Sequence, residues 1–385
     1  MIRHRLPVRV AVLCSVAVLS ASAWADRLPS NVKSSQNPAS VNTQIQSLID
    51  AQVKILAGDD PATAQLARTT LVYEVENHTG SKQSPQYQTA YCADLAKAVI
   101  PILAGGKASL RTRVNIGVVV NDVAARTFRN GGDTSPLDPV VQQLLKDKQQ
   151  AVVLWGLKCS KYILASTLQN AGNATALSKQ IAKTAEANSD FGPAIEEAYN
   201  ALMLQGKELE NLKANPAVFG PLVAPIIPDL LDLVESRTAK FKASGGQVPS
   251  PQAEHGLGTF LSVNVYDGAL AANPKLRDRS LRAMGDLTCA YLRSAANGNV
   301  TPESIDMIKE QGKAFQVLGE NMQNAGVASV GKAISGIPTN NPNLNALGDL
   351  CDSLSNSLKS VNVNINSGGG AAETPAPPAL AGTPK

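Results

Sequence analysis

The sequence predicts an all-α protein built from many amphipathic helices. Apolar residues recur three and four positions apart from Ile45 to Leu358, which is the spacing of one face of an α-helix. Proline stands at several points where such a pattern begins, and proline is tolerated in the first turn of a helix. Hydrophobic residues make up 44% of the chain but aromatic residues only 4%. Alanine and leucine dominate the apolar residues of the chain, and both residue types favour helices over strands.

The first 25 residues have the organisation of a secretory signal peptide. A basic start precedes an apolar run from Val10 to Val18, which is too short to span a bilayer. Ala23 and Ala25 are the small residues that a signal peptidase reads, so cleavage is expected before Asp26. We therefore expect an exported protein, periplasmic or extracellular, without a membrane span.

The residues after this leader predict the first elements. Residues 26–40 are polar and rich in Ser, Asn and Pro, and they are expected to form a flexible lead-in. A helix is expected over Ile45–Leu56, ending near Gly58. Asp60 and Pro61 then open a second helix, because the Asp side chain can accept hydrogen bonds from the free N–H groups of a first turn.

The same combination of a polar residue and proline predicts later helices, starting near Asp138, Pro228, Asn273 and Thr301. One segment is ambiguous, because the apolar residues of Val114–Val120 alternate as in a strand. The run continues into Val123–Arg126, a stretch that suits a helix better. We therefore expect a helix there as well.

Two helical halves are expected. They cover residues 41–244 and 253–366, joined by a linker at 245–252 that begins with Gly245 and Gly246. From 367 to 385 the chain is rich in Gly, Pro and Ala and has little apolar surface to bury. This last segment is expected to be a disordered tail.

Four cysteines remain after cleavage, namely Cys92, Cys159, Cys289 and Cys351. An even number in an exported chain suggests two disulfides, and no Cys-x-x-Cys motif points to a metal or redox site. We favour one bond in each half, Cys92–Cys159 and Cys289–Cys351. The other two connectivities, or buried free thiols, remain alternatives.

The charge and aromatic content weigh against several classes of function. The chain has 35 basic and 31 acidic residues, and three of the basic ones leave with the leader. The mature chain is thus close to neutral, which gives little attraction for nucleic acid. Trp155 is its single Trp, and this scarcity of aromatic residues counts against an aromatic-lined sugar cleft.

The stretch from Leu137 to Lys158 resembles a HEAT repeat. In that family a first helix ends in Leu-Leu, an acidic turn follows, and a second helix opens with an apolar pair and closes near Gly. Leu144, Asp147, Val152 and Gly156 are among the matching positions, whereas Leu154 stands where the family commonly has Arg. No regular period of repeats can be read. The resemblance implies an α-solenoid that binds macromolecules through its concave face, and it implies no catalytic residues.

Short motifs that suggest catalysis lack the context that catalysis needs. Gly326–Lys332 has the spacing of a phosphate-binding loop, but no strand precedes it and Ala333 follows the Lys, so we interpret its glycines as helix ends. Ser30–Lys33 and Ser329–Lys332 match Ser-x-x-Lys without the companion motifs of penicillin-interacting enzymes.

The mature chain has two histidines, His78 and His255, and neither has a helix-spaced metal-ligand neighbour, so both are interpreted as surface loop residues. No catalytic, cofactor or metal site is predicted. The function we expect is a non-catalytic scaffold or binding module for a protein or an envelope polymer. An exported helical lyase or hydrolase, or a structural envelope component, is the alternative.

Overall fold

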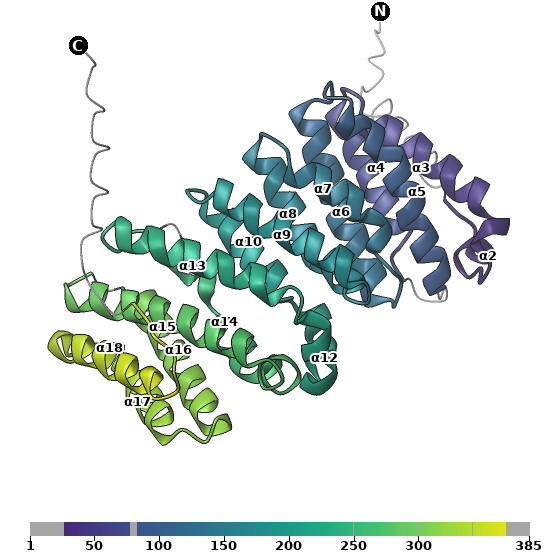
Figure 1. The fold of residues 1–385 in the computed structure, drawn as a ribbon. Coiled ribbons are helices and arrows are strands. Elements are labelled where there is room, and N and C mark those ends of the chain that lie inside the picture. The colour runs from purple at the N-terminus through teal and green to yellow at the C-terminus, as the bar shows by residue number, and fades with distance from the viewer. Residues whose placement is uncertain (1–26, 78–82, 249, 300, 341, 367–385) are drawn as a thin grey trace, which may run out of the picture. The chain divides into compact units, whose positions relative to one another are not determined.

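The computed structural model describes residues 27–77 and 83–366, apart from residues 249, 300 and 341. Every regular element within those residues is a helix, which confirms the predicted all-α class (Figure 1). The predicted leader with Ala23, Ala25 and Asp26 lies outside the described residues, as does the predicted tail 367–385. The chain forms two compact units, Met1–Ala214 and Asn215–Lys385, called unit 1 and unit 2 below.

Unit 1 is a stack of helix pairs in two layers (Figure 1). Consecutive helices pack against each other as α3 with α4, α5 with α6, α7 with α8, and α9 with α10. The first helices of the pairs lie side by side in one layer, and the second helices lie side by side in the other. The bounds are α3 Asn42–Leu56, α4 Pro61–Tyr73, α5 Pro85–Ala104, α6 Leu110–Arg129, α7 Asp138–Leu145, α8 Gln150–Thr167, α9 Ala171–Ala187 and α10 Gly192–Leu202.

Local sequence signals account for several of these helices. The carboxylate of Asp60 accepts hydrogen bonds from the N–H groups of Ala62 and Thr63 at 3.2 and 3.1 Å, as the predicted cap requires. The ambiguous segment 114–126 lies within α6, so the helical interpretation is confirmed. The segment 137–158 forms the α7–α8 pair. There Gly156 lets the two helices approach closely, since a Cβ on it would lie 3.0 Å from Cβ of Leu144.

The prediction of a flexible lead-in over residues 26–40 is wrong. Leu28 and Val32 are buried, and the short helices α2 (Ser30–Lys33) and η1 (Pro38–Ser40) lie in this segment. Nζ of Lys33 contacts a carboxylate oxygen of Glu74 at 2.7 Å, and both side chains are almost completely buried. Composition suggested disorder because few of these residues are apolar, whereas buried apolar side chains, the ion pair and hydrogen bonds from Ser84 to the carbonyls of Lys33 and Ser35 attach the segment to unit 1.

Unit 2 also contains two groups of neighbouring helices. α13 and α18 both pack against α15, while α16 packs against α14, η5 and α17. The bounds are α12 Pro216–Val223, α13 Ile227–Ala243, η4 Pro251–Glu254, α14 Leu257–Thr259, η5 Phe260–Asn264, η6 Tyr266–Leu270, α15 Pro274–Ala296, α16 Pro302–Asn321, α17 Ala325–Ser335 and α18 Leu344–Lys359. Both η5 and η6 are π-helical, an uncommon conformation that widens each turn.

The boundary between the units lies at Ala214/Asn215, so the predicted halves, 41–244 and 253–366, and their linker at 245–252 need correction. Helix α13 belongs to unit 2, because Phe241 stacks on Tyr291 with ring centroids 4.4 Å apart. Gly245 and Gly246 have positive φ values of 68° and 96° and mark the turn that ends α13. A glycine pair signals a turn, and a turn within a domain has the same composition as a domain boundary.

Among the described residues, no single helix combines the length and hydropathy needed to cross a bilayer. Helices α12 and α13 meet that criterion only when taken together, and they are bent by 72° at the break between them.

Candidate functional site

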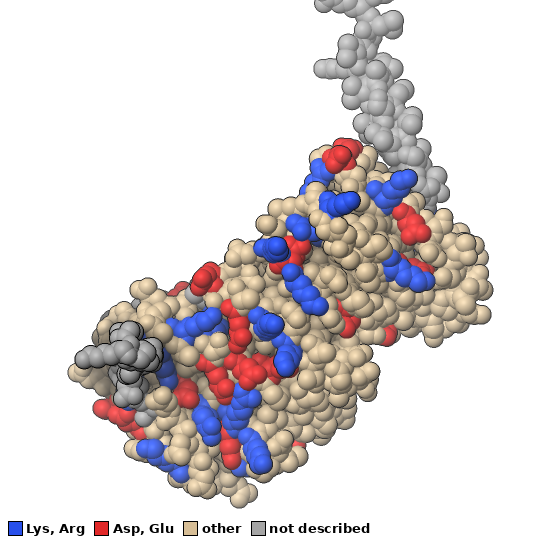
Figure 2. Space-filling view, turned by 45° about the horizontal axis from the view of Figure 1, so that its top comes forward, with Lys and Arg blue, Asp and Glu red and all other residues tan. Residues whose placement is uncertain are grey.

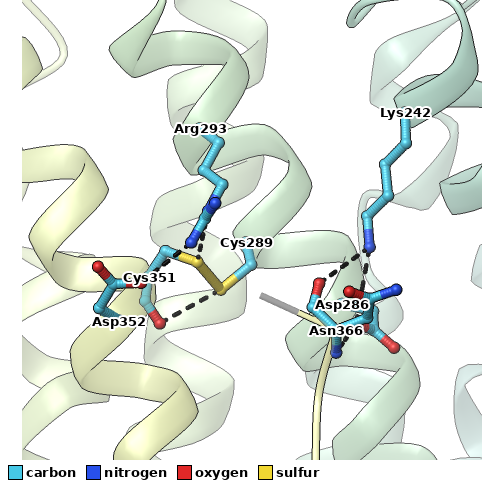
Figure 3. The surroundings of a disulfide bond; sticks show 7 residues. All are labelled: Lys242, Asp286, Cys289, Arg293, Cys351, Asp352 and Asn366. Carbon is cyan, nitrogen blue, oxygen red and sulfur yellow. Dashed lines mark hydrogen bonds and ion pairs between the residues drawn. A yellow bond between two sulfur atoms is a disulfide. The ribbon is translucent and has the colours of Figure 1, made fainter. Parts of the chain in front are cut away.

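Cys289 and Cys351 form a disulfide, one of the two predicted bonds (Figure 3). Their Cα atoms lie 4.9 Å apart, and the bond joins α15 to α18. Nε of Arg293 donates to Sγ of Cys351 at 3.3 Å, and the same guanidinium contacts Asp352 at 3.0 Å. Both cysteines are almost completely buried, so the bond holds the helices together and offers no accessible redox centre.

The predicted Cys92–Cys159 bond is absent, and both thiols are free and buried. Sγ of Cys92 lies 3.5 Å from Oγ1 of Thr127, whereas Sγ of Cys159 lies 3.6 Å from the carbonyl of Gly117. Both thiols therefore pack against α6, but at points about 15 Å apart along it, given a rise of 1.5 Å per residue. A disulfide needs Cα atoms within about 7 Å. Sequence separation could not reveal that distance.

The motifs set aside in the sequence have structural roles. Lys33 of the first Ser-x-x-Lys is held in the buried ion pair with Glu74. His255 lies on the surface with its side chain 73% exposed, and its Nδ1 contacts the carboxylate of Glu310 at 2.8 Å. His78 lies outside the described residues. Within the described part of the chain, no group of three or more His, Cys, Asp and Glu could hold a metal ion.

The glycines of Gly326–Lys332 have a different role from the one expected. They lie within α17, where Gly331 faces α16, so the interpretation as helix ends is wrong. A Cβ on Gly331 would overlap the backbone N of Gln316, and one on Gly319 of α16 would overlap Ala328. The two helices thus meet backbone to backbone, and the glycines allow this close packing.

The polar surface best suited to binding lies in unit 1, where two cavities share Arg129. We call them together the Arg129 site. The α6 cavity has a volume of about 400 Å³, and Glu76, Asn77, Asn121, Asp122, Ala125, Arg126, Arg129, Asn130 and Tyr162 line it. The η3 cavity has a volume of about 660 Å³, and Phe128, Arg129, Gly131, Lys207, Glu208, Asn211 and Leu212 line it. The second cavity borders on the short helices η3 (Lys207–Leu209) and α11 (Glu210–Lys213).

The amphipathic pattern of α6 positions this site. Its buried residues include Ile116, Val120 and Val123, which hold the helix in the stack. Asn121, Asp122, Ala125, Arg126 and Arg129 recur at helical spacing on another side of α6, and they line the α6 cavity. Helix α6, a member of the second-helix layer, therefore presents polar side chains to the α6 cavity.

Hydrogen bonds and ion pairs fix the shape of the Arg129 site. Nδ2 of Asn77 donates to Oδ1 of Asn130 at 2.8 Å, which ties the end of α4 to the end of α6. Nη2 of Arg129 donates to Oε1 of Glu208 at 2.8 Å, and the Arg129 side chain remains 60% exposed. A guanidinium has five N–H donors, so this bond leaves other donors of Arg129 available to a ligand.

The electrostatics of the site favour fixed protonation states at neutral pH. Burial raises the pKa of Tyr162 to about 12, so its phenol stays neutral. A hydrogen bond from the Glu208 backbone N–H lowers the pKa of that carboxyl, and the hydrogen bond from Arg129 lowers it further. The site can therefore offer amide, guanidinium and ammonium donors together with carboxylate acceptors. It contains no nucleophile paired with a base among the residues that line it.

Sequence reasoning missed this site. The available signal was the polar set Asn121, Asp122, Arg126 and Arg129, whose members recur at helical spacing on one side of an amphipathic helix. The contributions of Asn77, Tyr162 and Lys207 come from distant parts of the chain, and no local pattern indicates them.

Charges of both signs are interspersed on the face shown in Figure 2, and neither sign forms a patch of its own there. This agrees with the nearly neutral composition. Unit 2 also has a cavity of about 580 Å³, next to Phe241, Tyr291 and Thr301, but the described residues that line it are all uncharged.

No known family model matches the chain, and no curated protein matches it.

Proposed function

We propose that this protein is exported and acts as a HEAT-like helical-repeat module that binds a partner through the second-helix layer of unit 1, with the Arg129 site at the C-terminal end of α6 as part of that surface. The partner is a protein or an envelope polymer. The observation that carries this proposal is the polar side of α6, which is bordered by two cavities that share Arg129.

The arrangement of unit 1 supports the repeat interpretation. Its helix pairs follow one another in two layers, as stacked helical repeats do. The first helices of the pairs begin at residues 42, 85, 138 and 171, at unequal intervals. The helices differ in length, from 8 residues in α7 to 20 residues in α5 and in α6, and this difference accounts for much of the irregular spacing.

Two independent features support export. Residues 1–25 have the basic start, apolar run and small cleavage-site residues of a cleaved signal peptide, and the Cys289–Cys351 disulfide fits an oxidising compartment. N-terminal sequencing of the secreted protein tests this part. A mature form that starts at Asp26 is expected, whereas one that retains Trp24 would contradict cleavage at Ala25.

The binding function is tested with immobilised mature protein. Envelope proteins and purified envelope polysaccharide from the source cells are applied separately, and saturable binding is measured. Arg129→Glu is expected to weaken binding about tenfold or more, since it places a carboxylate beside Glu208. Lys183→Glu is the matched control, because Lys183 is an exposed basic residue on α9 in the other layer. Equal effects of the two variants would contradict the assigned surface, and binding of neither material would favour a structural role.

A further inference from the structure

The unit 2 cavity, with a volume of about 580 Å³, is lined in part by uncharged hydrogen-bonding groups. It lies where α13 and α15 end and α16 begins, all within unit 2. Gln247, Asn299 and Thr301 line it, and each of these residues is exposed. Two amides and a hydroxyl can therefore donate hydrogen bonds to an occupant, and no charged residue among the described lining would attract an ion.

Apolar side chains form another part of this lining. Phe241 and Tyr291 stack on each other, and the half-buried Val248 also lines the cavity. The two rings are only 5% and 2% exposed, so they give a small apolar contact and no open face on which a sugar ring could stack. The cavity thus suits an uncharged chain segment with apolar side chains and free carbonyl oxygens.

The last described residue, Asn366, is held close to this cavity. Its N–H donates to Oδ1 of Asp286 at 2.6 Å, and Nζ of Lys242 donates to its carbonyl at 3.2 Å (Figure 3). Lys242 follows Phe241 in α13, and Tyr291 comes five residues after Asp286 in α15, which is about 7.5 Å along the helix axis. Asn366 therefore contacts the same two helices whose C-terminal ends line the cavity.

The C-terminal tail, residues 367–385, matches the cavity in chemistry and length. Residues 374–384 carry no charge, and they include four prolines and one large apolar residue, Leu380. Because proline has no N–H, this stretch has more carbonyl acceptors than donors. Residues 367–373, which precede it, can span up to about 23 Å, which exceeds the distance along α15 from Asp286 to Tyr291.

We propose that residues 374–384 bind in the unit 2 cavity of the same chain, with Leu380 against the apolar part of the lining. Carbonyl oxygens of the proline-rich stretch accept hydrogen bonds from Gln247 and Asn299. Attachment at Asn366 gives the stretch an effective concentration on the order of millimolar, so weak contacts are sufficient. A proline-rich stretch also loses little conformational entropy on binding. The inference goes beyond the proposed function and does not depend on the Arg129 site.

The inference is tested by photo-crosslinking of the mature full-length protein, with a diazirine-bearing residue in place of Ala379. Peptide mapping by mass spectrometry is expected to place the crosslinks in residues 241–248 and 291–304. Because the interaction is intramolecular, the yield should not change on about tenfold dilution. Crosslinks confined to other residues, crosslinks between two copies, or a yield that falls with dilution would overturn the inference.

Substitutions test the individual contacts. Leu380→Asp and Gln247→Glu should each lower the crosslink yield about threefold or more, since the first places a charge against the apolar lining and the second places a carboxylate opposite carbonyl oxygens. Gln323→Glu, at another exposed position of unit 2, is the matched control and should leave the yield unchanged. An equal loss in the control would contradict the assigned contacts. Arg129→Glu should not alter the yield, so failure of this inference and failure of the proposed binding surface can be told apart.

Discussion

Units 1 and 2 are built from the same kind of amphipathic helix but are held together by different means. Unit 1 stacks helix pairs in two layers, leaves Cys92 and Cys159 as free buried thiols, and anchors residues 27–40 in part by the buried Lys33–Glu74 ion pair. Unit 2 joins α15 to α18 by a disulfide and brings α16 and α17 into backbone contact through glycines.

The cavities differ in the same way. Those of unit 1 are lined by charges of both signs, whereas the unit 2 cavity described above is lined by uncharged described residues. Apolar periodicity therefore decides the class of fold that the two units share. Crosslinks, close contacts between helices and polar surfaces differ between the units and depend on the particular residues of each. Each of these differences can be tested in one unit with the other as an internal reference.

The largest expected effect is loss of the disulfide. The double variant Cys289→Ala/Cys351→Ala should destabilise unit 2 by about 4 kcal/mol on the chain-entropy model, because the bond closes a loop with a sequence separation of 62. Urea unfolding followed by hydrogen-exchange mass spectrometry measures this for each unit. Unit 1 should unfold at an unchanged urea concentration, and an equal shift in both units would contradict their independence.

The matching change in unit 1 removes its buried ion pair. Lys33→Met should destabilise unit 1 by about 3 kcal/mol, since it leaves the carboxylate of Glu74 buried without its partner. The same exchange measurement should show earlier exposure of residues 27–40. Lys54→Met on α3 is the control, because Lys54 is exposed, and a similar loss there would show that the charge itself, and not the ion pair, matters.

A smaller effect is expected from the close packing of α16 and α17. Gly331→Ala should destabilise unit 2 by about 2 kcal/mol, because its Cβ would overlap the backbone of Gln316 and force the helices apart. Gly348→Ala on α18 is the matched control. A Cβ there meets no atom within 4 Å, so helix propensity should raise stability by about 0.5–1 kcal/mol. Destabilisation by both variants would argue against a packing role.

The smallest effect concerns the thiols of unit 1. Burial raises the pKa of Cys92 to about 12 and raises that of Cys159 strongly as well. Native protein should therefore not react with a thiol reagent such as Ellman's reagent, and the absence of reaction should persist from pH 7 to pH 9. After denaturation two thiols should react. Because the raised pKa values favour the protonated folded state, the contribution of these thiols to stability is lost only as pH rises from about 9 towards 12. Rapid reaction in the native state would contradict their burial.

Features that depend on residues close together in the sequence could be predicted, whereas features that depend on residues far apart could not. Helix starts such as Asp60–Pro61 and Thr301–Pro302 could be predicted because a cap and its first turn are neighbours in sequence. The Cys92–Cys159 bond could not be judged correctly, because the two thiols contact α6 at separate points. The position of the unit boundary depended on which helices α13 packs against, which composition does not encode.

The sequence by itself determined the helical class, several helix starts and the near-neutral charge, because these depend on residue type and on spacing within a few turns. The tertiary structure decided which cysteines pair, that residues 27–40 are packed, and that Asn77, Arg129 and Lys207 line one surface. Such contacts join residues that are distant in sequence. Their distances are set by how the helices pack, which depends on side-chain shape on facing helices and not on local periodicity.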